Sequence, residues 1–260
     1  MVLYFTGTGN SRYVAELIAE ATGDKLVNIS EYTRDGHPAD FEEPGPYVFV
    51  SPVYVSAPAK PFMEFVKRSS FPRDAKAYFI MTSAASMGGS PEYCRRLSAK
   101  KSLLYQGAIN VVMPQNYVLL AQAREDEQLR KRIENARPVI ERIADTIKAG
   151  DALPPDGMQA WEYAACVLVV DFYCKHFMKA KAFRVSEDCI SCGKCASACP
   201  LGNIVMRDGR PLWGNDCTHC MACISLCPVQ AVEFGRLTQG RRRYQGPKSV
   251  LKEEQTIPQR

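Results

Sequence analysis

Two dense cysteine runs lie near the carboxyl end of the sequence. CISCGKCASACP spans residues 189–200 and CTHCMACISLCP spans residues 217–228, so each cysteine recurs 28 positions later. Each run reads C-x2-C-x2-C-x3-C-P, a spacing that wraps three thiolates around one face of an iron–sulfur cubane. A zinc ribbon is the alternative, but zinc sites use two cysteine pairs with a longer spacer and four ligands per ion. The spacing and the duplication therefore favour two 4Fe–4S clusters.

The duplicated segment, residues 184–235, resembles the bacterial-type ferredoxin domain that holds two 4Fe–4S clusters. In that family the fourth cysteine of each run ligates the cluster of the other run. The resemblance implies two crossed ligand sets: a first cysteine set of Cys189, Cys192, Cys195 and Cys227, and a second cysteine set of Cys217, Cys220, Cys223 and Cys199. His219 stands between two ligands of the second set. It either modulates that cluster by its charge or fills space as a partly exposed side chain.

A different motif, FTGTGNS at residues 5–11, follows the first apolar run of the chain. A loop between a strand and a helix offers free backbone N–H groups and a helix N-terminus to an anion. No lysine follows it, so it is not a Walker A loop, and it is not G-x-G-x-x-G. It suits one terminal phosphate monoester, whereas the alternative is a plain glycine-rich turn. The loop resembles the flavodoxin phosphate loop, which implies bound FMN and the phosphate-binding residues Thr6, Gly7, Thr8, Gly9, Asn10 and Ser11.

Residues 1–150 must position this loop, and they alternate between strand and helix patterns. The expected strands are residues 2–5, 25–29, 47–50, 76–81 and 109–113, and the expected helices lie near residues 11–21, 59–68, 91–104 and 124–148. Buried strands alternating with helices predict a parallel sheet that is covered on both faces. Pro138 interrupts the last helix, where proline favours a kink. The fold class is therefore an α/β flavodoxin-like doubly wound sheet of five parallel strands in the order 2-1-3-4-5, with a small α+β two-cluster ferredoxin domain.

In such a sheet the ligand binds at the carboxyl ends of the strands, where the loops after strands one, three, four and five converge. Tyr54 is the best-placed aromatic residue to stack on an isoalloxazine ring, although an ordinary loop tyrosine is the alternative. The loop after strand four is small and flexible, so its backbone can lie along the flavin edge. The expected flavin contacts in these loops are Pro52, Val53, Tyr54, Ser83, Ala84, Gly88, Gly89 and Asn116.

Four segments follow from these patterns. LPPDG at residues 153–157 marks a boundary, and residues 158–183 read as a helix with Trp161, Ala165, Leu168, Phe172 and Phe183 among its apolar positions. The expected segments are a flavodoxin-like FMN-binding domain at 1–150, a helical connector at 151–183, a two-cluster ferredoxin domain at 184–237 and a basic C-terminal tail at 238–260.

Composition narrows the class of protein. The chain has 260 residues, 46% hydrophobic and 23% charged, which is ordinary for a globular protein. Met1 leads straight into VLYF without a basic flank, and the longest apolar run, AACVLVV, is too short to span a bilayer. We therefore expect a cytoplasmic protein without a membrane span. Eleven cysteines in a reducing compartment favour metal over disulfides, and Cys94, Cys166 and Cys174 are expected to be buried free thiols.

The net charge of +5 comes from the tail, since residues 236–260 hold seven Lys or Arg and two Asp or Glu. No nucleic-acid-binding motif accompanies this charge, so we expect no nucleic acid partner. Arg241, Arg242 and Arg243 form its centre. This segment is a solvated tail, a docking site for an acidic redox partner, or a segment that folds back against the junction of the two domains.

Nearly the whole chain resembles the flavodoxin–ferredoxin fusion proteins of anaerobic bacteria and archaea. The resemblance implies an electron-transfer protein that passes electrons among FMN, two 4Fe–4S clusters and redox partner proteins. An enzyme that reduces a small organic acceptor such as a quinone at the flavin is the main alternative, and a flavodoxin-like domain that binds no flavin is a third. With His37, His176 and His219 as its histidines, the chain has no Ser/His/Asp or Cys/His catalytic arrangement, so we assign no catalytic residue.

Overall fold

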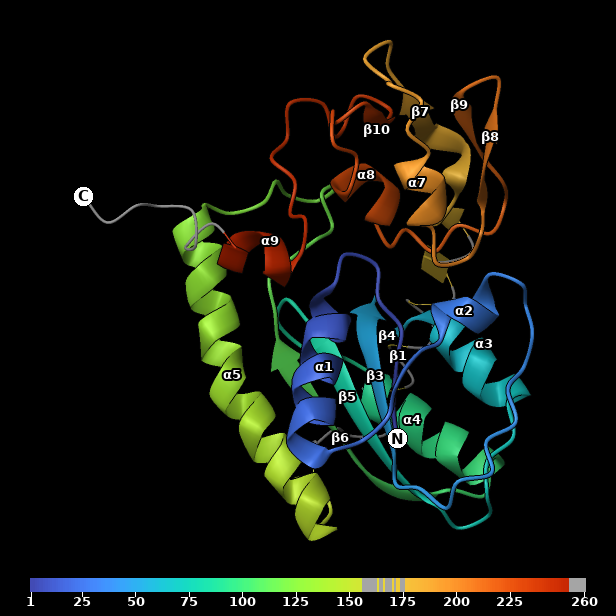
Figure 1. The fold of residues 1–260 in the computed structure, drawn as a ribbon, viewed down its shortest axis with the longest axis vertical. Coiled ribbons are helices and arrows are strands. Elements are labelled where there is room, and N and C mark those ends of the chain that lie inside the picture. The colour runs from blue at the N-terminus through green and yellow to red at the C-terminus, as the bar shows by residue number, and fades with distance from the viewer. Residues whose placement is uncertain (156–162, 164–165, 167–169, 171, 174–175, 253–260) are drawn as a thin grey trace.

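The computed structural model describes residues 1–155, 163, 166, 170, 172–173 and 176–252. Figure 1 shows a larger part below, built on a central sheet, and a smaller part above it. We call residues 1–155 the flavodoxin-like part and residues 180–235 the cysteine-rich part. No helix among the described residues is both long enough and apolar enough to cross a membrane.

The central sheet has the predicted strand order. Its parallel strands are β1 (Val2–Tyr4), β2 (Leu26–Asn28), β3 (Tyr47–Tyr54), β5 (Lys76–Ser83) and β6 (Leu104–Val112), arranged β2-β1-β3-β5-β6. The two-residue strand β4 (Ala57–Pro58) pairs antiparallel with β3 and lies off this path. The five parallel strands therefore follow the order 2-1-3-4-5, which confirms the flavodoxin-like fold.

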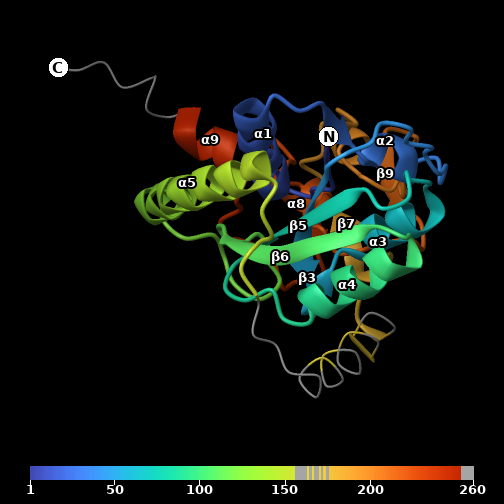
Figure 2. The same ribbon diagram turned by 90° about the horizontal axis from the view of Figure 1, so that it is seen from below.

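Helices cover both faces of the sheet (Figure 2). Along β3, Val48 and Val50 pack with α1 (Asn10–Thr22) and α5 (Asp126–Ala149), while Tyr47 and Phe49 pack with α3 (Lys60–Arg68) and α4 (Ser90–Lys100). Successive strand residues point to opposite faces, so one apolar strand supplies both cores. The carboxyl ends of the parallel strands lie on the side of the sheet that faces the cysteine-rich part (Figure 1).

Three local features differ from the sequence-based expectations. Strand β6 begins at Leu104 and not at residue 109, because its first half lies at a sheet edge where Leu104 is 46% exposed and the apolar signal is weak. The short helix α2 (Ser30–Thr33) was not predicted, since one helical turn leaves no periodicity to detect. Helix α5 continues through Pro138 as one element.

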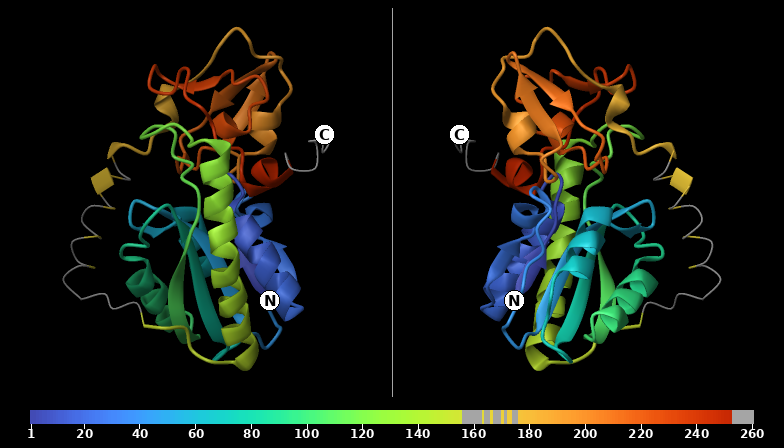
Figure 3. Two further views of the ribbon diagram at one scale, coloured as in Figure 1. Left: turned by 90° about the vertical axis from the view of Figure 1, so that its left-hand side faces the viewer. Right: turned by 90° about the vertical axis from the view of Figure 1, so that its right-hand side faces the viewer.

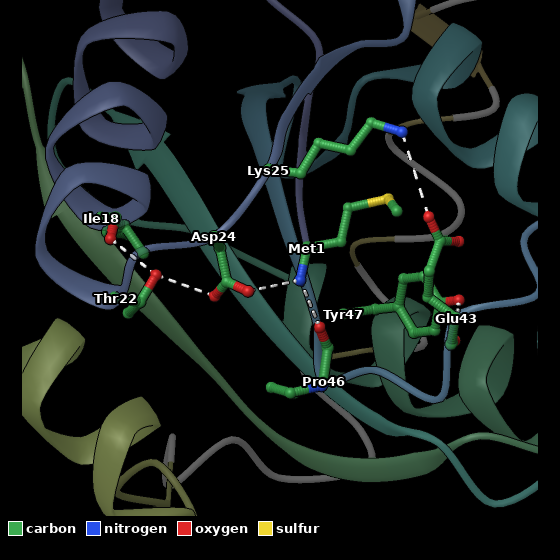
Figure 4. Close-up of polar contacts among 8 residues, drawn as sticks. All are labelled: Met1, Ile18, Thr22, Asp24, Lys25, Glu43, Pro46 and Tyr47. Atoms are coloured by element: carbon green, nitrogen blue, oxygen red, sulfur yellow. Dashed lines mark hydrogen bonds and ion pairs between the residues drawn. The ribbon is translucent and has the colours of Figure 1, made fainter.

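The amino-terminal residue is tied to the base of the sheet (Figure 4). The Met1 ammonium donates to Asp24 Oδ1 at 2.9 Å and to the Pro46 carbonyl at 2.7 Å. Asp24 also accepts a hydrogen bond from Thr22 Oγ1 at 2.8 Å, so the end of α1 and the start of β1 are joined. These contacts lie at the amino ends of the strands, on the side away from the cysteine runs.

The cysteine-rich part repeats one pattern twice. Helix α7 (Lys194–Ser197) carries Cys195 of the first run, and α8 (Ala222–Ser225) carries Cys223 of the second. Two antiparallel pairs complete it: β7 (Phe183–Val185) with β10 (Val232–Phe234), and β8 (Ile204–Arg207) with β9 (Arg210–Trp213).

Half of the expected connector helix at residues 158–183, including Trp161, Ala165 and Leu168, lies outside the described residues. At its carboxyl end the expectation is wrong, because a 3-10 turn, η1 (Ala180–Ala182), leads into β7 at Phe183. The Phe183 side chain stacks on Trp213 at 5.6 Å between ring centroids, so its apolar character serves the core of the cysteine-rich part.

The segment after β10 returns to the flavodoxin-like part and ends in α9 (Pro247–Lys252), which lies beside α5 and α1 in the side views (Figure 3). Tyr244 and Val250 are buried in the same core as those two helices. Arg241 donates to the carbonyls of Val118 and Leu119. These contacts are those of a segment folded back at the junction, and they leave Arg241 unavailable for a docking patch.

Candidate functional site

The second cysteine set surrounds a small cavity in the cysteine-rich part. Its lining includes all four cysteines of the set, together with the apolar side chains of Phe183, Ile204 and Trp213. One of these cysteines, Cys199, belongs to the first run. An apolar shell of this kind limits solvent access to a bound metal group and so controls its potential.

The thiols of the two runs lie close enough to affect one another. Burial raises the pKa of Cys195, and negative charge on Cys227 raises it further. Burial also raises the pKa of Cys217 to about 11, and negative charge on Cys199 adds to the rise. Cys227 therefore lies near the first run and Cys199 near the second, as crossed ligation requires. The ligand assignment itself stays a prediction.

Among the residues that the structure describes, no three cysteine, histidine or carboxylate side chains converge on a point suited to a single metal ion. A 4Fe–4S cluster attaches each thiolate to a separate iron atom, so its ligands stand further apart than those of one ion. Backbone amides already approach the sulfurs: the Ala231 amide donates to Cys227 Sγ at 3.2 Å, and the His219 amide donates to Cys217 Sγ at 3.4 Å.

His219 is buried and hydrogen-bonded, and not partly exposed. Its Nδ1 lies 3.1 Å from the Tyr117 hydroxyl and its Nε2 lies 2.9 Å from the Lys179 carbonyl. Burial lowers the pKa of the imidazole, which favours the neutral form at neutral pH. A neutral ring adds no positive charge beside the second cysteine set, so its role here is to hold Tyr117 and the chain entering β7.

The candidate phosphate loop has the geometry of an anion site. Gly9, at φ 103°, is the N-cap of α1, and no side chain of the described residues caps the helix. Thr6 Oγ1 accepts a hydrogen bond from the Gly9 amide at 3.0 Å, and Thr8 Oγ1 accepts one from Asn116 Nδ2 at 3.0 Å. Each hydroxyl uses a lone pair in these bonds and keeps its own proton for a further acceptor. The two protons and the uncapped helix N-terminus fit a terminal phosphate.

The other side chains of this loop are engaged within the protein. Asn10 Nδ2 donates to the Pro114 carbonyl at 2.8 Å, and its Oδ1 accepts from the Tyr244 hydroxyl at 2.7 Å. Ser11 is buried and its hydroxyl lies 2.8 Å from Thr82 Oγ1. The structure therefore directs these two side chains toward the scaffold, and their direct role in binding phosphate stays a prediction.

Two close backbone approaches enclose the loop. A Cβ atom added to Gly7 would lie 2.5 Å from the Cys220 carbonyl oxygen, and one added to Gly246 would lie 2.3 Å from the Thr8 carbonyl oxygen. Neither position has room for a side chain. The loop is thus held between the second cysteine run and the returning C-terminal segment.

Asn116 links the same elements from the side. Its amide donates to Thr8 Oγ1 and also, at 3.3 Å, to the Cys220 carbonyl. One side chain therefore contacts both the candidate phosphate loop and a cysteine of the second set. Sequence reasoning identified Asn116 as a flavin contact, but it had no signal for this second bond, which depends on how the two parts pack.

The loops expected to hold the flavin ring meet one another directly. Val55 and Ser56 form the two-residue turn between β3 and β4, with φ values of 50° and 66°. A Cβ atom added to Gly88 would lie 2.5 Å from Ser56 Cβ, and one added to Gly89 would lie 3.0 Å from Cys166 Cβ. The loop after β5, which contains Gly88 and Gly89, thus lies against the turn after β3. The role of these residues in binding a flavin stays a prediction.

Other expected contacts are built into the sheet. Pro52 accepts a backbone hydrogen bond from Ala59, Val53 pairs with Pro58, and Ser83 Oγ donates to Asn110 Oδ1 at 2.9 Å. Ala84 follows Ser83 directly at the end of β5. These residues hold the ends of the strands from which the loops begin.

Tyr54 ends β3 with its hydroxyl buried and without a hydrogen-bond partner among the described residues. Beside it lies a cleft of about 1280 Å³ between the two parts. The cleft is lined by Tyr54, Tyr93, Met178, Cys217 and basic side chains that include Lys60, Arg68 and Lys179. It reaches the second cysteine set, so a molecule in the cleft would lie next to Cys217.

Of the three cysteines outside the runs, Cys94 is buried as expected, whereas Cys166 is half-buried. Cys174 lies outside the described residues. No disulfide bond joins two of the described cysteines.

Residues 188–232 match the family model of the 4Fe-4S dicluster domain. Similar solved structures include a putative flavoprotein from Bacteroides uniformis, at 10% identity and TM-score 0.34, covering 56% of this chain and 96% of that chain. Rubredoxin oxygen:oxidoreductase from Desulfovibrio gigas is similar at 11% identity and TM-score 0.32, with 57% of this chain and 35% of that chain covered. The Flv1 flavodiiron core from Synechocystis is similar at 11% identity and TM-score 0.30, with 56% and 36% covered. No curated protein matches the chain.

The chain therefore carries a 4Fe–4S dicluster domain at residues 188–232, joined to a sheet that is flavodoxin-like by its own strand order.

Proposed function

We propose that this chain is an electron-transfer protein that passes electrons among an FMN, two 4Fe–4S clusters and external redox partner proteins. The contact between the candidate phosphate loop and the second cysteine run carries this proposal, since Gly7 packs directly on Cys220. Electron transfer between two redox groups requires that they be close, and this contact brings their two binding loops together.

In this proposal FMN supplies one- or two-electron chemistry and each cluster supplies one-electron chemistry, so the chain joins the two types of donor. The protein holds these groups in fixed positions relative to one another. Thr6, Thr8 and the N-terminus of α1 bind the phosphate, while the loops after β3 and β5 contact the ring. The first and second cysteine sets hold one cluster each.

The two cysteine sets differ in their access to a partner. Cys192 of the first set is exposed, as is its neighbour Ile190 at 61%. Cys220 of the second set instead faces the flavodoxin-like part through Gly7 and Asn116. Partner proteins therefore exchange electrons at the first set, and the second set connects it to the flavin. The cysteine content favours a reducing compartment, and we propose the cytoplasm.

The cleft beside Tyr54 supports a second candidate function. Its volume of about 1280 Å³ exceeds that of common small-molecule sites, which measure roughly 300–1,000 Å³. An organic acceptor such as a quinone could be reduced there, with the clusters conducting electrons inside the chain. Sustained turnover of a quinone by the photoreduced protein, at a rate that saturates with quinone concentration, favours this reductase over a carrier.

Binding of flavins to the apoprotein tests the proposal. Thr8→Val removes one phosphate donor, and a hydrogen bond to a charged group contributes about 1.5–3 kcal/mol, so FMN affinity should fall roughly 10- to 150-fold. Riboflavin lacks the phosphate, so its affinity should stay the same. Thr146→Val is the matched control, since that hydroxyl bonds the Arg142 carbonyl within α5. No FMN binding by the parent protein, or equal losses for FMN and riboflavin, contradicts the assignment of the loop.

A further inference from the structure

Buried hydrogen-bond donors gather around the second cysteine set. Thr218 Oγ1 is buried without a partner among the described residues, and Thr218 lines the cavity between the four cysteines. Trp213 lines the same cavity, and its indole N–H is likewise buried without a partner among the described residues. The Tyr54 hydroxyl is the third such donor, and it comes from the flavodoxin-like part. Buried donors without acceptors are costly and rare, so three at one place indicate an acceptor-rich group between them.

The position of Gly7 locates the Tyr54 hydroxyl. A Cβ atom added to Gly7 would lie 3.0 Å from Tyr54 Oη and 2.9 Å from Cys220 Cβ. The hydroxyl and Cys220 therefore face the same point of the phosphate loop. Burial raises the pKa of Tyr54, and negative charge on Cys220 and then Cys217 raises it further, which places both sulfurs within electrostatic reach of the hydroxyl.

We propose that the Tyr54 hydroxyl donates a hydrogen bond across the junction to a sulfur of the cluster held by the second cysteine set. This inference rests on the proposed function and deepens it. Tyr54 is a positioning and tuning residue, and it also lines the cleft between the two parts. A hydrogen bond to sulfur stabilises the more negative, reduced cluster and raises its potential.

The consequence is a difference between the two clusters. The second set has Tyr54, Trp213 and Thr218 around it, whereas the first set includes the exposed Cys192. Tyr54 thereby raises the potential of the inner cluster, beside the flavin. An electron arriving from a partner at the outer cluster is then drawn toward the flavin.

Redox titration followed by EPR, on anaerobically purified full-length protein, tests the inference. In Tyr54→Phe the hydroxyl is lost and the ring stays. The equilibrium constant for reducing one cluster should fall about tenfold, which is about 59 mV for one electron, and the other cluster should not change. Tyr78→Phe is the matched control, because the Tyr78 hydroxyl is also buried without a partner in the described part of the chain but lies in the sheet core with α1 and α5. Neither cluster should shift in that variant.

Two results overturn the inference: unchanged potentials in Tyr54→Phe, or equal shifts of both clusters. If Tyr54→Phe loses iron, 3,5-difluorotyrosine at position 54 replaces it, since a more acidic hydroxyl donates more strongly. That substitution should raise the potential of one cluster, and no change would also overturn the inference. If the parent protein shows two normal cluster signals and neither potential changes in the Tyr54 variants, this inference alone is wrong. A parent protein without clusters contradicts the proposed function as well.

Discussion

At Gly7 the flavodoxin-like part makes a close backbone contact with Cys220 of the cysteine-rich part. The φ of Gly7 is not in the left-handed region, so the need for glycine is steric and comes from the Cys220 backbone. This contact joins a residue of the candidate phosphate loop to an expected cluster ligand. The contact between the two binding loops, on which the proposed function rests, therefore requires a residue without a side chain at position 7.

Gly7→Ala should destabilise the junction. The added methyl would lie 2.5 Å from a backbone carbonyl that cannot turn away, and overpacking of this kind costs about 1–3 kcal/mol. The expected result is a lower midpoint of thermal unfolding and a changed EPR signal of the cluster held by Cys220. Gly23→Ala is the control: its Cβ would meet no atom within 4 Å, so it carries only the strain of φ 73°. A Gly7→Ala protein with a parental EPR signal contradicts the close contact.

Residue types alone predicted eight cluster ligands and a phosphate loop, because both motifs occupy short stretches with fixed spacing, and these roles stay predictions. Residue types did not predict where each loop side chain points. Asn10 turns to Tyr244, which is 234 positions away, and Asn116 reaches Cys220, which is 104 away. Such bonds depend on the packing of distant segments, and no local pattern encodes them.

Among the elements, the returning C-terminal segment holds the two parts together through arginines of different burial. Arg243 is 2% exposed and bonds Glu233 at 2.5 Å and the Ile224 carbonyl at 3.0 Å. Arg242 is 33% exposed and pairs with Glu125 and Asp126 on the surface. The same residue type thus has two different energetic roles in adjacent positions.

Arg243→Met should lower the unfolding free energy by about 3–5 kcal/mol, because it leaves the Glu233 carboxylate, whose side chain is 15% exposed, with the Thr238 hydroxyl but without its cationic partner. Arg242→Met should cost at most about 1 kcal/mol, since exposed ion pairs contribute little. Thermal unfolding of the two variants under anaerobic conditions provides the comparison. Equal midpoints would show that the Arg243 pair is not buried. A slower reaction with an acidic donor in Arg242→Met, abolished by salt, would restore a docking role for the segment.

The turn between β3 and β4 stores strain beside the candidate flavin site. Positive φ at both Val55 and Ser56 is the type I′ geometry, which glycine and asparagine favour and a β-branched residue resists. Val55→Gly should remove about 1–2 kcal/mol of strain and add about 0.5–1 kcal/mol of backbone entropy cost. The apoprotein should therefore be equally stable or more stable in urea. Val53→Gly, within the strand, should be less stable, and a clear loss of stability in Val55→Gly would contradict the strained turn.

Element prediction succeeded where burial was strong and failed where it was weak. The buried strands β3 and β5 have long apolar runs, so their existence and parallel order followed from the sequence. The first half of β6 is mostly half-buried and contains Gln106 and Gly107, so its apolar signal is weak. The end of the connector becomes η1 and β7, because Phe183 packs on Trp213. From the sequence, the fold-back of residues 241–252 was one of three alternatives, since composition does not indicate which groups an arginine contacts.

On the scale of the whole molecule, the two cysteine runs form one unit that rests on the carboxyl ends of the sheet (Figure 1). The first set faces outward at Cys192, and the second set meets the phosphate loop at Cys220. With the proposed function, this arrangement corresponds to the order partner, first set, second set and flavin. This order predicts which cysteines affect which cluster.

Crossed ligation can be separated from ligation within each run by combining substitutions. Cys227→Ala should damage the cluster of the first set, so the remaining cluster should still respond to Tyr54→Phe. Cys199→Ala should damage the cluster of the second set, so the remaining cluster should not respond. EPR-monitored titration of the two double variants measures this. The opposite pattern means that each run binds its own cluster with all four of its cysteines.

The most direct test of the central claim, that one chain holds a flavin beside two clusters, is a quantitation of iron, acid-labile sulfide, zinc and flavin in a single anaerobically purified sample. The account predicts about eight iron atoms and about eight sulfides per chain, as two cubane clusters require, together with one FMN and negligible zinc. A sample in which zinc replaces iron, or in which the iron is complete but FMN neither co-purifies nor binds on addition, would contradict it.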